Sequence, residues 1–249
     1  MKHLLCFLSV VFVFFCCAAC GEKKDSDALV VGTNAEFPPF EMRGGANGNE
    51  IIGFDMDVAR EIAAKNGKKL IIEDMKFDAL IPALNSGKVD MVFAGMTVTP
   101  ERAKNVDFSI PYYKVTQIVL LKQGDEAKIK NIDDLKGKKI AVALGTTGDS
   151  VASTLTPADK IIRFDSVFEA ILELKNSKAD LVLTDEALGE ILHARNPDLV
   201  RIDLPFEDEY YAAAVKKGNQ SLLDQINASL TSLKNTGEME ILLERYFSE

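Results

Sequence analysis

Short apolar segments alternate along the chain with segments in which apolar residues recur every three or four positions. The short segments are rich in valine, isoleucine and leucine, as buried strands are, whereas the periodic segments predict amphipathic helices. We expect strands at 29–32, 70–72, 89–94, 115–122, 140–143, 161–164, 181–184, 200–204 and 211–215. We expect helices at 55–65, 78–85, 149–154, 166–175, 186–194, 220–234 and 238–247, and a short helix after Thr99. This alternation predicts an α/β protein with mostly parallel sheets.

One stretch of the pattern occurs twice. Residues 77–92 (FDALIPALNSGKVDMV) and 164–182 (FDSVFEAILELKNSKADLV) share the order Phe-Asp, apolar helix, Asn-Ser, Lys, Asp and apolar strand. The repetition indicates two lobes of similar construction, although generic α/β units can also resemble one another by chance. Ligands on such sheets bind beyond the carboxyl ends of the strands, so two facing lobes would enclose a ligand between them.

The turn after the strand at 89–94 carries the clearest candidate chemistry. Thr99 is suited to be a helix N-cap, with Pro100 at the first helical position and Arg102 one turn in. Backbone N–H groups, the Thr97 hydroxyl and the Arg102 guanidinium would then converge on a volume that suits a carboxylate or a phosphate. An ordinary capped surface helix with a solvated arginine is the alternative. The run Gly145-Thr146-Thr147-Gly148 predicts a second anion-binding turn.

The first twenty residues differ from the rest of the chain. They hold all four cysteines and an apolar run from Leu4 to Ala19 that is short for a bilayer span. The run Ala18-Ala19-Cys20-Gly21 resembles the cleavage site of a bacterial lipoprotein, although Cys17 stands where leucine is usual. We expect a lipoprotein signal peptide over 1–19, lipid on Cys20 and a polar tether over 20–27. A plain secretory peptide is the alternative.

Charge and composition narrow the possible partners. The 249 residues include 29 basic and 38 acidic side chains, a net charge of −9. Nucleic acids and anionic lipids bind basic surfaces, so neither is expected as a partner. After cleavage before Cys20 the chain has no cysteine for a disulfide, and its fold must depend on an apolar core. No metal-spaced cluster, cofactor motif or heptad pattern is recognised, so we expect a monomer without metal or cofactor.

Eight segments in order carry a resemblance to a known family. They are VGTNAEFPPFE, IGFDMDVAREIA, FDALIPALNSGKVD, AGMTVTPER, VDFSIPYY, IAVALGTTGDS, LTDEA and the closing segment from Gly218 to Phe247. Together they resemble the bacterial solute-binding proteins of family 3, the substrate-binding lipoproteins of polar amino-acid ABC transporters. The resemblance implies a two-lobed periplasmic-binding-protein fold of type II, each lobe a mixed, mostly parallel sheet flanked by helices. It implies lobe 1 at 28–113 and 211–249, lobe 2 at 118–206, and crossing hinge strands at 114–117 and 207–210.

The resemblance also implies roles for particular residues. Arg102 and the backbone N–H groups of Thr97 and Thr147 would hold the α-carboxylate of a free amino acid. Asp185 and the carbonyl of Gly95 would hold its α-ammonium. Phe37 and Phe77 would enclose the ligand side chain between their rings. The other residues of the implied lining are Asn34, Glu36, Ala94, Met96, Ala143 and Thr146. As alternatives, Asp185 would cap the following helix and the two phenylalanines would belong to the core.

Selectivity for the ligand side chain depends on Asn34 and Glu36. Relatives that bind basic amino acids often have an acid at the position of Asn34, whereas asparagine fits a neutral polar end as well as a cationic one. Glu36 would supply the missing charge if it faces the ligand, and the aromatic pair suits a guanidinium. We therefore expect a basic or amide amino acid, arginine first.

The expected function is a non-enzymatic receptor on the periplasmic side of the membrane. The lobes would close on a free L-amino acid, and the closed form would deliver it to the permease subunits of an ABC transporter. An enzyme similar to prephenate or arogenate dehydratases is one alternative, but beyond the signal segment the chain has a single histidine, His193. Glu36 is the acid considered for such a role. A stand-alone amino-acid sensor is the other alternative.

Overall fold

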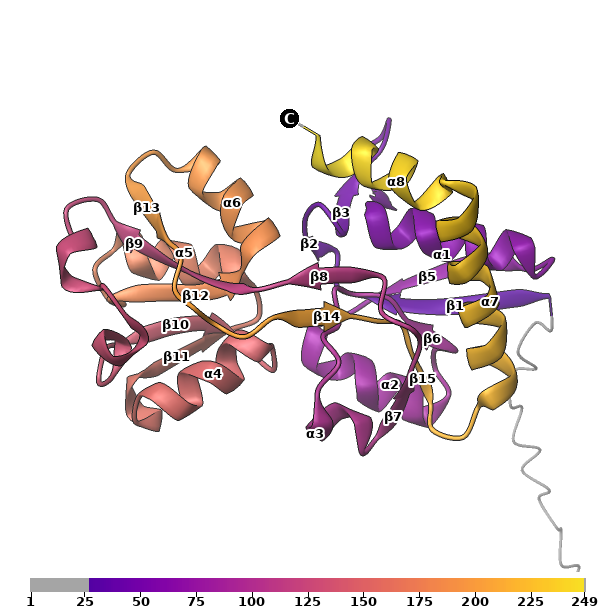
Figure 1. Ribbon diagram of the computed structural model, residues 1–249, viewed down its shortest axis with the longest axis horizontal. Helices are drawn as coiled ribbons and strands as arrows, with labels where there is room; N and C mark the ends of the chain where they lie inside the picture. Colours follow the sequence, from indigo (N-terminus) through magenta and orange to yellow (C-terminus); the bar gives the residue numbers. More distant parts are fainter. Residues whose placement is uncertain (1–26, 249) are drawn as a thin grey trace, which may run out of the picture.

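The computed structural model describes residues 27–248. They form two lobes, each built on a five-stranded sheet, with two chain segments crossing between them (Figure 1). The two-lobed α/β fold expected from the sequence is confirmed. The expected signal peptide, Cys20 and all but the last residue of the expected tether lie outside the described residues. None of the helices described is long and apolar enough to span a bilayer.

The sheet of the first lobe has the strand order β5-β1-β6-β15-β7. Its strands are β1 (Ala28–Thr33), β5 (Lys69–Asp74), β6 (Met91–Val92), β7 (Val106–Phe108) and β15 (Ala214–Lys216). Strands β5, β1 and β6 are parallel, and β15 lies antiparallel between β6 and β7. The helices of this lobe are α1 (Phe54–Lys65), α2 (Leu80–Ser86), α3 (Pro100–Ala103), α7 (Gln220–Thr236) and α8 (Glu238–Phe247).

The sheet of the second lobe has the order β11-β10-β12-β9-β13. Its strands are β9 (Gln117–Lys122), β10 (Ile140–Ala143), β11 (Ile161–Phe164), β12 (Leu181–Asp185) and β13 (Leu199–Ile202). Its helices are α4 (Thr147–Leu155), α5 (Val167–Lys175) and α6 (Glu186–Arg195). As in the first lobe, the first three strands of this order are parallel, and the fourth, β9, is antiparallel to both of its neighbours, β12 and β13. The repeated sequence segments therefore supply equivalent units, α2 with β6 and α5 with β12.

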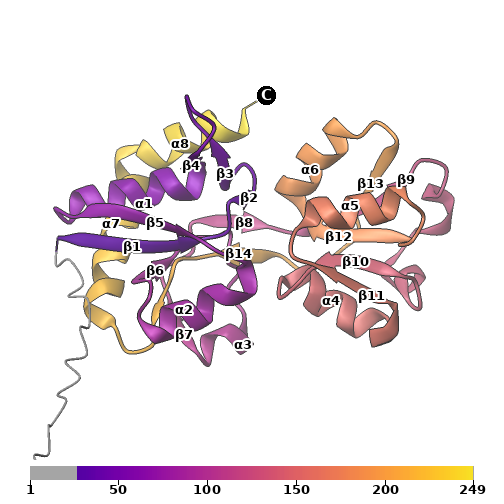
Figure 2. The same cartoon turned by 180° about the vertical axis from the view of Figure 1, so that it is seen from behind.

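Each sheet has helices on both faces (Figure 2). Successive residues of a strand point to opposite faces. Leu29 and Val31 of β1 accordingly pack with α1, α7 and α8, whereas Val30 packs with α2 on the other face. In the second lobe α5 and α6 cover one face and α4 the other. Both faces of each sheet are thus buried, which leaves the strand ends as the place for a site.

The connections between the lobes differ in detail from the expected strands. The expected strand 115–122 is divided at Thr116 into β8 (Tyr113–Val115) and β9, and the expected strand 211–215 is divided into β14 (Glu209–Tyr211) and β15. Strands β8 and β14 pair antiparallel where the chain crosses between the lobes. Each crossing segment therefore continues into the sheet of a lobe.

A small three-stranded sheet beside the first lobe had no counterpart among the expected elements. It consists of β2 (Glu36–Phe37), β3 (Glu41–Gly44) and β4 (Glu50–Ile52). These strands are only two to four residues long and mostly partly exposed, so they lack the apolar alternation that predicts a strand. Short 3₁₀ turns complete the described chain: η1 (Phe77–Ala79), η2 (Glu126–Lys128), η3 (Ile132–Leu135) and η4 (Ala158–Lys160).

Candidate ligand-binding site

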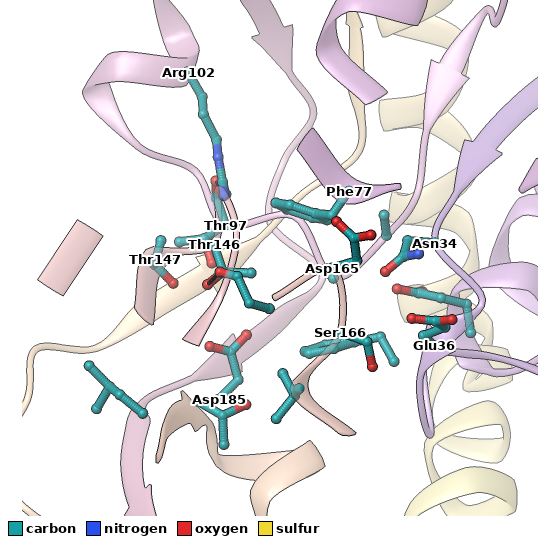
Figure 3. Close-up of a pocket in the computed structure, with 18 residues that line it drawn as sticks. Asn34, Glu36, Phe77, Thr97, Arg102, Thr146, Thr147, Asp165, Ser166 and Asp185 are labelled. Atoms are coloured by element: carbon teal, nitrogen blue, oxygen red, sulfur yellow. Dashed lines mark hydrogen bonds between the residues drawn. The ribbon is translucent and has the colours of Figure 1, made fainter. Parts of the chain in front are cut away.

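A pocket of roughly 570 Å³, its open mouth included, lies between the two lobes (Figure 3). The first lobe contributes Asn34, Glu36, Phe37, Glu41, Phe77, Ala94, Gly95, Thr97 and Arg102. The second lobe contributes Ala143, Thr146, Thr147, Asp165, Ser166, Val167, Leu183, Thr184 and Asp185. Most of these residues follow the carboxyl end of a strand, as expected for ligand sites on open α/β sheets.

The structure brings all of the expected ligand-binding residues except Met96 into this lining. The Met96 side chain is only 1% exposed and lies in the core beneath the pocket with Leu80 and Val92. Met96 thus belongs to the apolar cluster of the first lobe, while its neighbours Gly95 and Thr97 line the pocket. The expectation that Met96 lines the site is therefore corrected.

Arg102 is held by both lobes. Thr99 caps α3 as expected, since its hydroxyl oxygen accepts from the Arg102 N–H at 3.1 Å. The guanidinium donates to the Thr97 carbonyl at 2.8 Å and to the Gly145 carbonyl of the other lobe at 3.0 Å. Its Cζ lies 5.1 Å from the centre of the Phe77 ring. Burial lowers the pKa of Arg102, but an arginine remains cationic, so a fixed positive charge stands at this end of the pocket.

Asp185 places a carboxylate near this cation. It occupies the N-cap position of α6 but makes no capping hydrogen bond, so the alternative of a helix cap does not describe it. Its oxygens accept instead from the Gln117 amide and the Tyr211 hydroxyl. Burial raises the pKa of Asp185 to about 6, although both of these donors lower it. A buried carboxylate with a raised pKa is stabilised by an added cationic partner.

Three residues on the two chain segments that cross between the lobes take part in this arrangement and were missed from the sequence. Gln117 and Tyr211 are the donors to Asp185, and Glu209 accepts from two threonine hydroxyls. The Thr97 hydroxyl of one lobe donates to Glu209 Oε2 at 3.0 Å, and the Thr147 hydroxyl of the other donates to the same oxygen at 2.7 Å. Their sequence carries no motif, because only the crossing of the strands brings them to the pocket.

The turn at Gly95 is supported from behind by two buried acids. Asp55 Oδ2 accepts from the Gly95 N–H at 2.8 Å and from the Tyr112 hydroxyl at 2.7 Å. Burial raises the pKa of Asp55 to about 7 and raises that of Glu41 well above its usual value. With both acids ionised, Asp55 Oδ1 and the Glu41 oxygens would have no donor. A proton on Glu41 lets it donate to Asp55 and keeps the support intact.

The far end of the pocket is polar and acidic. Figure 3 shows Asn34, Glu36 and Asp165 across the pocket from Arg102, with Phe77 between. Asp165 and Ser166 follow β11 directly, so the rule that ligands bind beyond the carboxyl ends of strands could have identified them. In the described part of the chain, no group of three or more His, Cys, Asp or Glu residues is placed to hold a metal ion. The geometry suits a small zwitterion with a polar or cationic tail.

Comparison with known proteins gives concordant matches. A model of the bacterial extracellular solute-binding proteins, family 3, matches residues 29–249. The arginine-binding extracellular protein ArtP of Bacillus subtilis (strain 168) is 33% identical over 100% of this chain and 99% of its own. A probable histidine-binding protein of Neisseria gonorrhoeae is 37% identical over 93% of this chain and 91% of its own.

Solved structures match at similar levels. The P235GK mutant of ArgBP from T. maritima superposes with a TM-score of 0.83 and 44% identity, covering 90% of this chain and 96% of the other. An ancestral arginine-binding protein bound to glutamine gives a TM-score of 0.83 and 41% identity, covering 91% of this chain and 100% of the other.

Proposed function

The chain belongs to the bacterial extracellular solute-binding proteins of family 3, and from this we propose that it captures a free L-amino acid outside the cytoplasm for an ABC transporter. Relatives are named for binding arginine, histidine and glutamine. Arginine-bound structures of similar proteins support arginine as the first candidate ligand. The proposed ligand is therefore a basic or amide amino acid.

The observation that carries this proposal is the convergence of Arg102 and Asp185 on one pocket from different lobes. Their charges complement the α-carboxylate and the α-ammonium of an amino acid. A ligand that contacts both favours the arrangement in which the lobes are close together. We propose that the lobes open and close about the crossing strands β8 and β14.

Glu36 and Asn34 support the preference for arginine. Both line the end of the pocket opposite Arg102, where the side chain of a ligand held at its α-carbon by Arg102 and Asp185 would extend. Glu36 offers a carboxylate to a guanidinium, and Asn34 can accept a further hydrogen bond. Phe77 offers an aromatic face to the aliphatic or guanidinium part.

No catalytic activity is proposed. His193, the only histidine within residues 27–248, is absent from the pocket lining. The acids of the lining are placed to compensate charges on a ligand. This arrangement favours reversible capture over general acid–base catalysis.

The first test is titration calorimetry with the twenty L-amino acids on unsubstituted protein and on Arg102→Ala. Loss of a charge-assisted contact to the α-carboxylate should weaken binding by roughly a hundredfold or more. Arg245→Ala is the matched control, since Arg245 pairs with Asp57 outside the pocket. Unchanged affinity in Arg102→Ala would show that the guanidinium does not hold the ligand.

Membrane anchoring and delivery to a permease complete the proposal. The lipoprotein-like run before Gly21 supports lipid attachment at Cys20. Cys20→Ser should abolish the incorporation of labelled fatty acid into the protein, whereas Cys6→Ser, outside the cleavage run, should leave it unchanged. Labelled fatty acid on Cys20→Ser would exclude this anchor.

A further inference from the structure

An ion pair joins the two lobes at the mouth of the pocket. Lys76 immediately precedes η1 in the first lobe, and its ammonium donates to the carboxylate of Asp165, which follows β11 in the second. Asp165 also lines the pocket, with its carboxylate near Phe77 and Asn34 (Figure 3). The same carboxylate is therefore accessible to a ligand and occupied by a cation of the protein.

Charges around this end of the pocket are unevenly arranged. Arg102 is the only lysine or arginine in the lining, and it lies at the other end. A second hollow lies outside the mouth, and Arg43 and Arg195 are among its lining residues. Arg43 pairs there with Asp74. In the pocket lining, the far end thus presents the carboxylates of Glu36 and Asp165, and the ammonium paired with Asp165 belongs to Lys76, which lies outside that lining.

The Lys76–Asp165 pair is easily exchanged. The two side chains are 64% and 48% exposed, and an ion pair of this kind contributes little stability. A guanidinium offers a planar set of donors that can bond a carboxylate through two parallel hydrogen bonds, which an ammonium cannot do. Glu169 also lies close enough to favour the charged form of Lys76, so the released ammonium keeps an acidic neighbour.

We propose that Asp165 is a specificity-determining residue, and that the cationic end of a bound basic amino acid replaces the Lys76 ammonium on its carboxylate. The inference rests on the proposed function and adds a residue of the second lobe to the recognition of the ligand side chain. A neutral side chain of the same length cannot replace Lys76, because it brings no charge to Asp165. Selection for a basic ligand is thereby linked to an existing contact between the lobes.

The test compares L-arginine with L-citrulline, in which a neutral urea group replaces the guanidinium. Calorimetry on Asp165→Asn should show roughly a tenfold loss of affinity for arginine and little change for citrulline. Lys76→Gln should bind arginine more tightly than the unsubstituted protein does, again with little change for citrulline. Asp159→Asn and Lys69→Gln are controls of equal charge change on exposed positions outside the pocket.

Three results would overturn the inference. An unchanged arginine-to-citrulline ratio in Asp165→Asn would show that the carboxylate does not contact the ligand cation. Equal losses for both ligands in both variants would show that the ion pair only holds the lobes together. A preference of the unsubstituted protein for citrulline would overturn the inference while leaving amino-acid capture intact. Binding of no amino acid at all would instead refute the proposed function, and this inference with it.

Discussion

Within the pocket, Asp185 combines deep burial with an ionisable group. Among the described residues, the Gln117 amide and the Tyr211 hydroxyl donate to Asp185, and neither brings a charge. The pKa of Asp185 is raised to about 6 mainly by burial, which makes the ionised form less favourable. In the ligand-free protein this raised pKa means that the contribution of Asp185 to stability is complete below about pH 4 and is lost as the pH rises through about 6.

Replacement of this acid should separate binding from stability. Asp185→Asn removes the buried charge. The side-chain amide of Gln117 can then rotate so that Gln117 Oε1, which has no hydrogen-bond partner in the unsubstituted protein, accepts from the new amide. We expect a higher unfolding temperature for the ligand-free variant at pH 8 and a loss of arginine affinity of roughly a hundredfold. Thermal unfolding and calorimetry check the two effects. A lower unfolding temperature would contradict the account of Asp185 as a destabilising buried charge.

The pH dependence of binding follows from the same group. An ammonium beside Asp185 favours its ionised form, so binding lowers its pKa below the value of about 6 in the free protein. Affinity should therefore be highest above pH 6 and should fall by up to about tenfold per pH unit below it. Calorimetry between pH 4.5 and 8 would measure this profile. Asp185→Asn should have a flatter profile, and an equal slope in the variant would assign the dependence to another group.

At the scale of elements, the turn between β6 and α3 joins the core to the pocket. Gly95 has a φ of 52°, and a Cβ there would lie 2.7 Å from Phe37 Cε1 and 3.3 Å from Tyr211 Cε2. The turn thus needs both the left-handed backbone and the space of a glycine. Asp55 holds its N–H from behind, so the turn, the ring of Phe37 and the buried acids form one rigid support for the site.

Gly95→Ala tests this support against Gly87→Ala. Gly87, at the end of α2, also has a positive φ, 79°, but a Cβ there meets nothing within 4 Å. Each variant should lose about 1 kcal/mol of unfolding free energy for the backbone alone. Only Gly95→Ala should also displace the Phe37 ring and weaken arginine binding, by roughly tenfold. Urea unfolding and calorimetry on both variants give the comparison. Equal affinities in the two would show that the ring position does not matter to the ligand.

Elements and site residues differ in how well the sequence predicts them. Apolar periodicity located the helices and all strands of both sheets except β7, whose three residues are too few to show a pattern, because packing on both sheet faces demands it. The turns at strand ends, with Arg102 and Asp185, carry local signals in caps and polar residues. Gln117, Glu209 and Tyr211 carry none, since their proximity to the pocket arises only when the two chain segments cross. Met96 was assigned to the lining together with the neighbouring residues of its turn, and only the structure shows that its side chain packs in the core.

At the scale of the whole molecule, direct contacts bridge the two lobes. Arg102 donates to Gly145, and Glu209 accepts from a threonine of each lobe. The ring of Phe37 packs against the cores of both lobes, and Ala187 of α6 packs against the core of the first lobe. A ligand between the lobes adds to an interface that is partly formed.

Ligand binding should therefore stabilise the two lobes together. At about one hundred times its dissociation constant, arginine should raise the unfolding free energy by about 2.7 kcal/mol, which corresponds to a shift of about 5–11 °C in a chain of this size. Differential scanning calorimetry should show this shift within a single transition, and Arg102→Ala should show none at the same arginine concentration. A shift confined to one of two separate transitions would mean that the ligand contacts one lobe only.

The position of β15 in the first sheet has a consequence for biosynthesis. Strand β7 lies at the edge of that sheet and pairs with β15 alone, and α7 and α8, which complete the core, come later still. The second lobe, by contrast, is formed from one continuous stretch between the two crossings. Because the chain emerges with its N-terminus first, the first lobe is the first to begin folding and the last to complete its sheet. An export pathway must keep about the first hundred residues from aggregating until the final segment arrives to close their sheet.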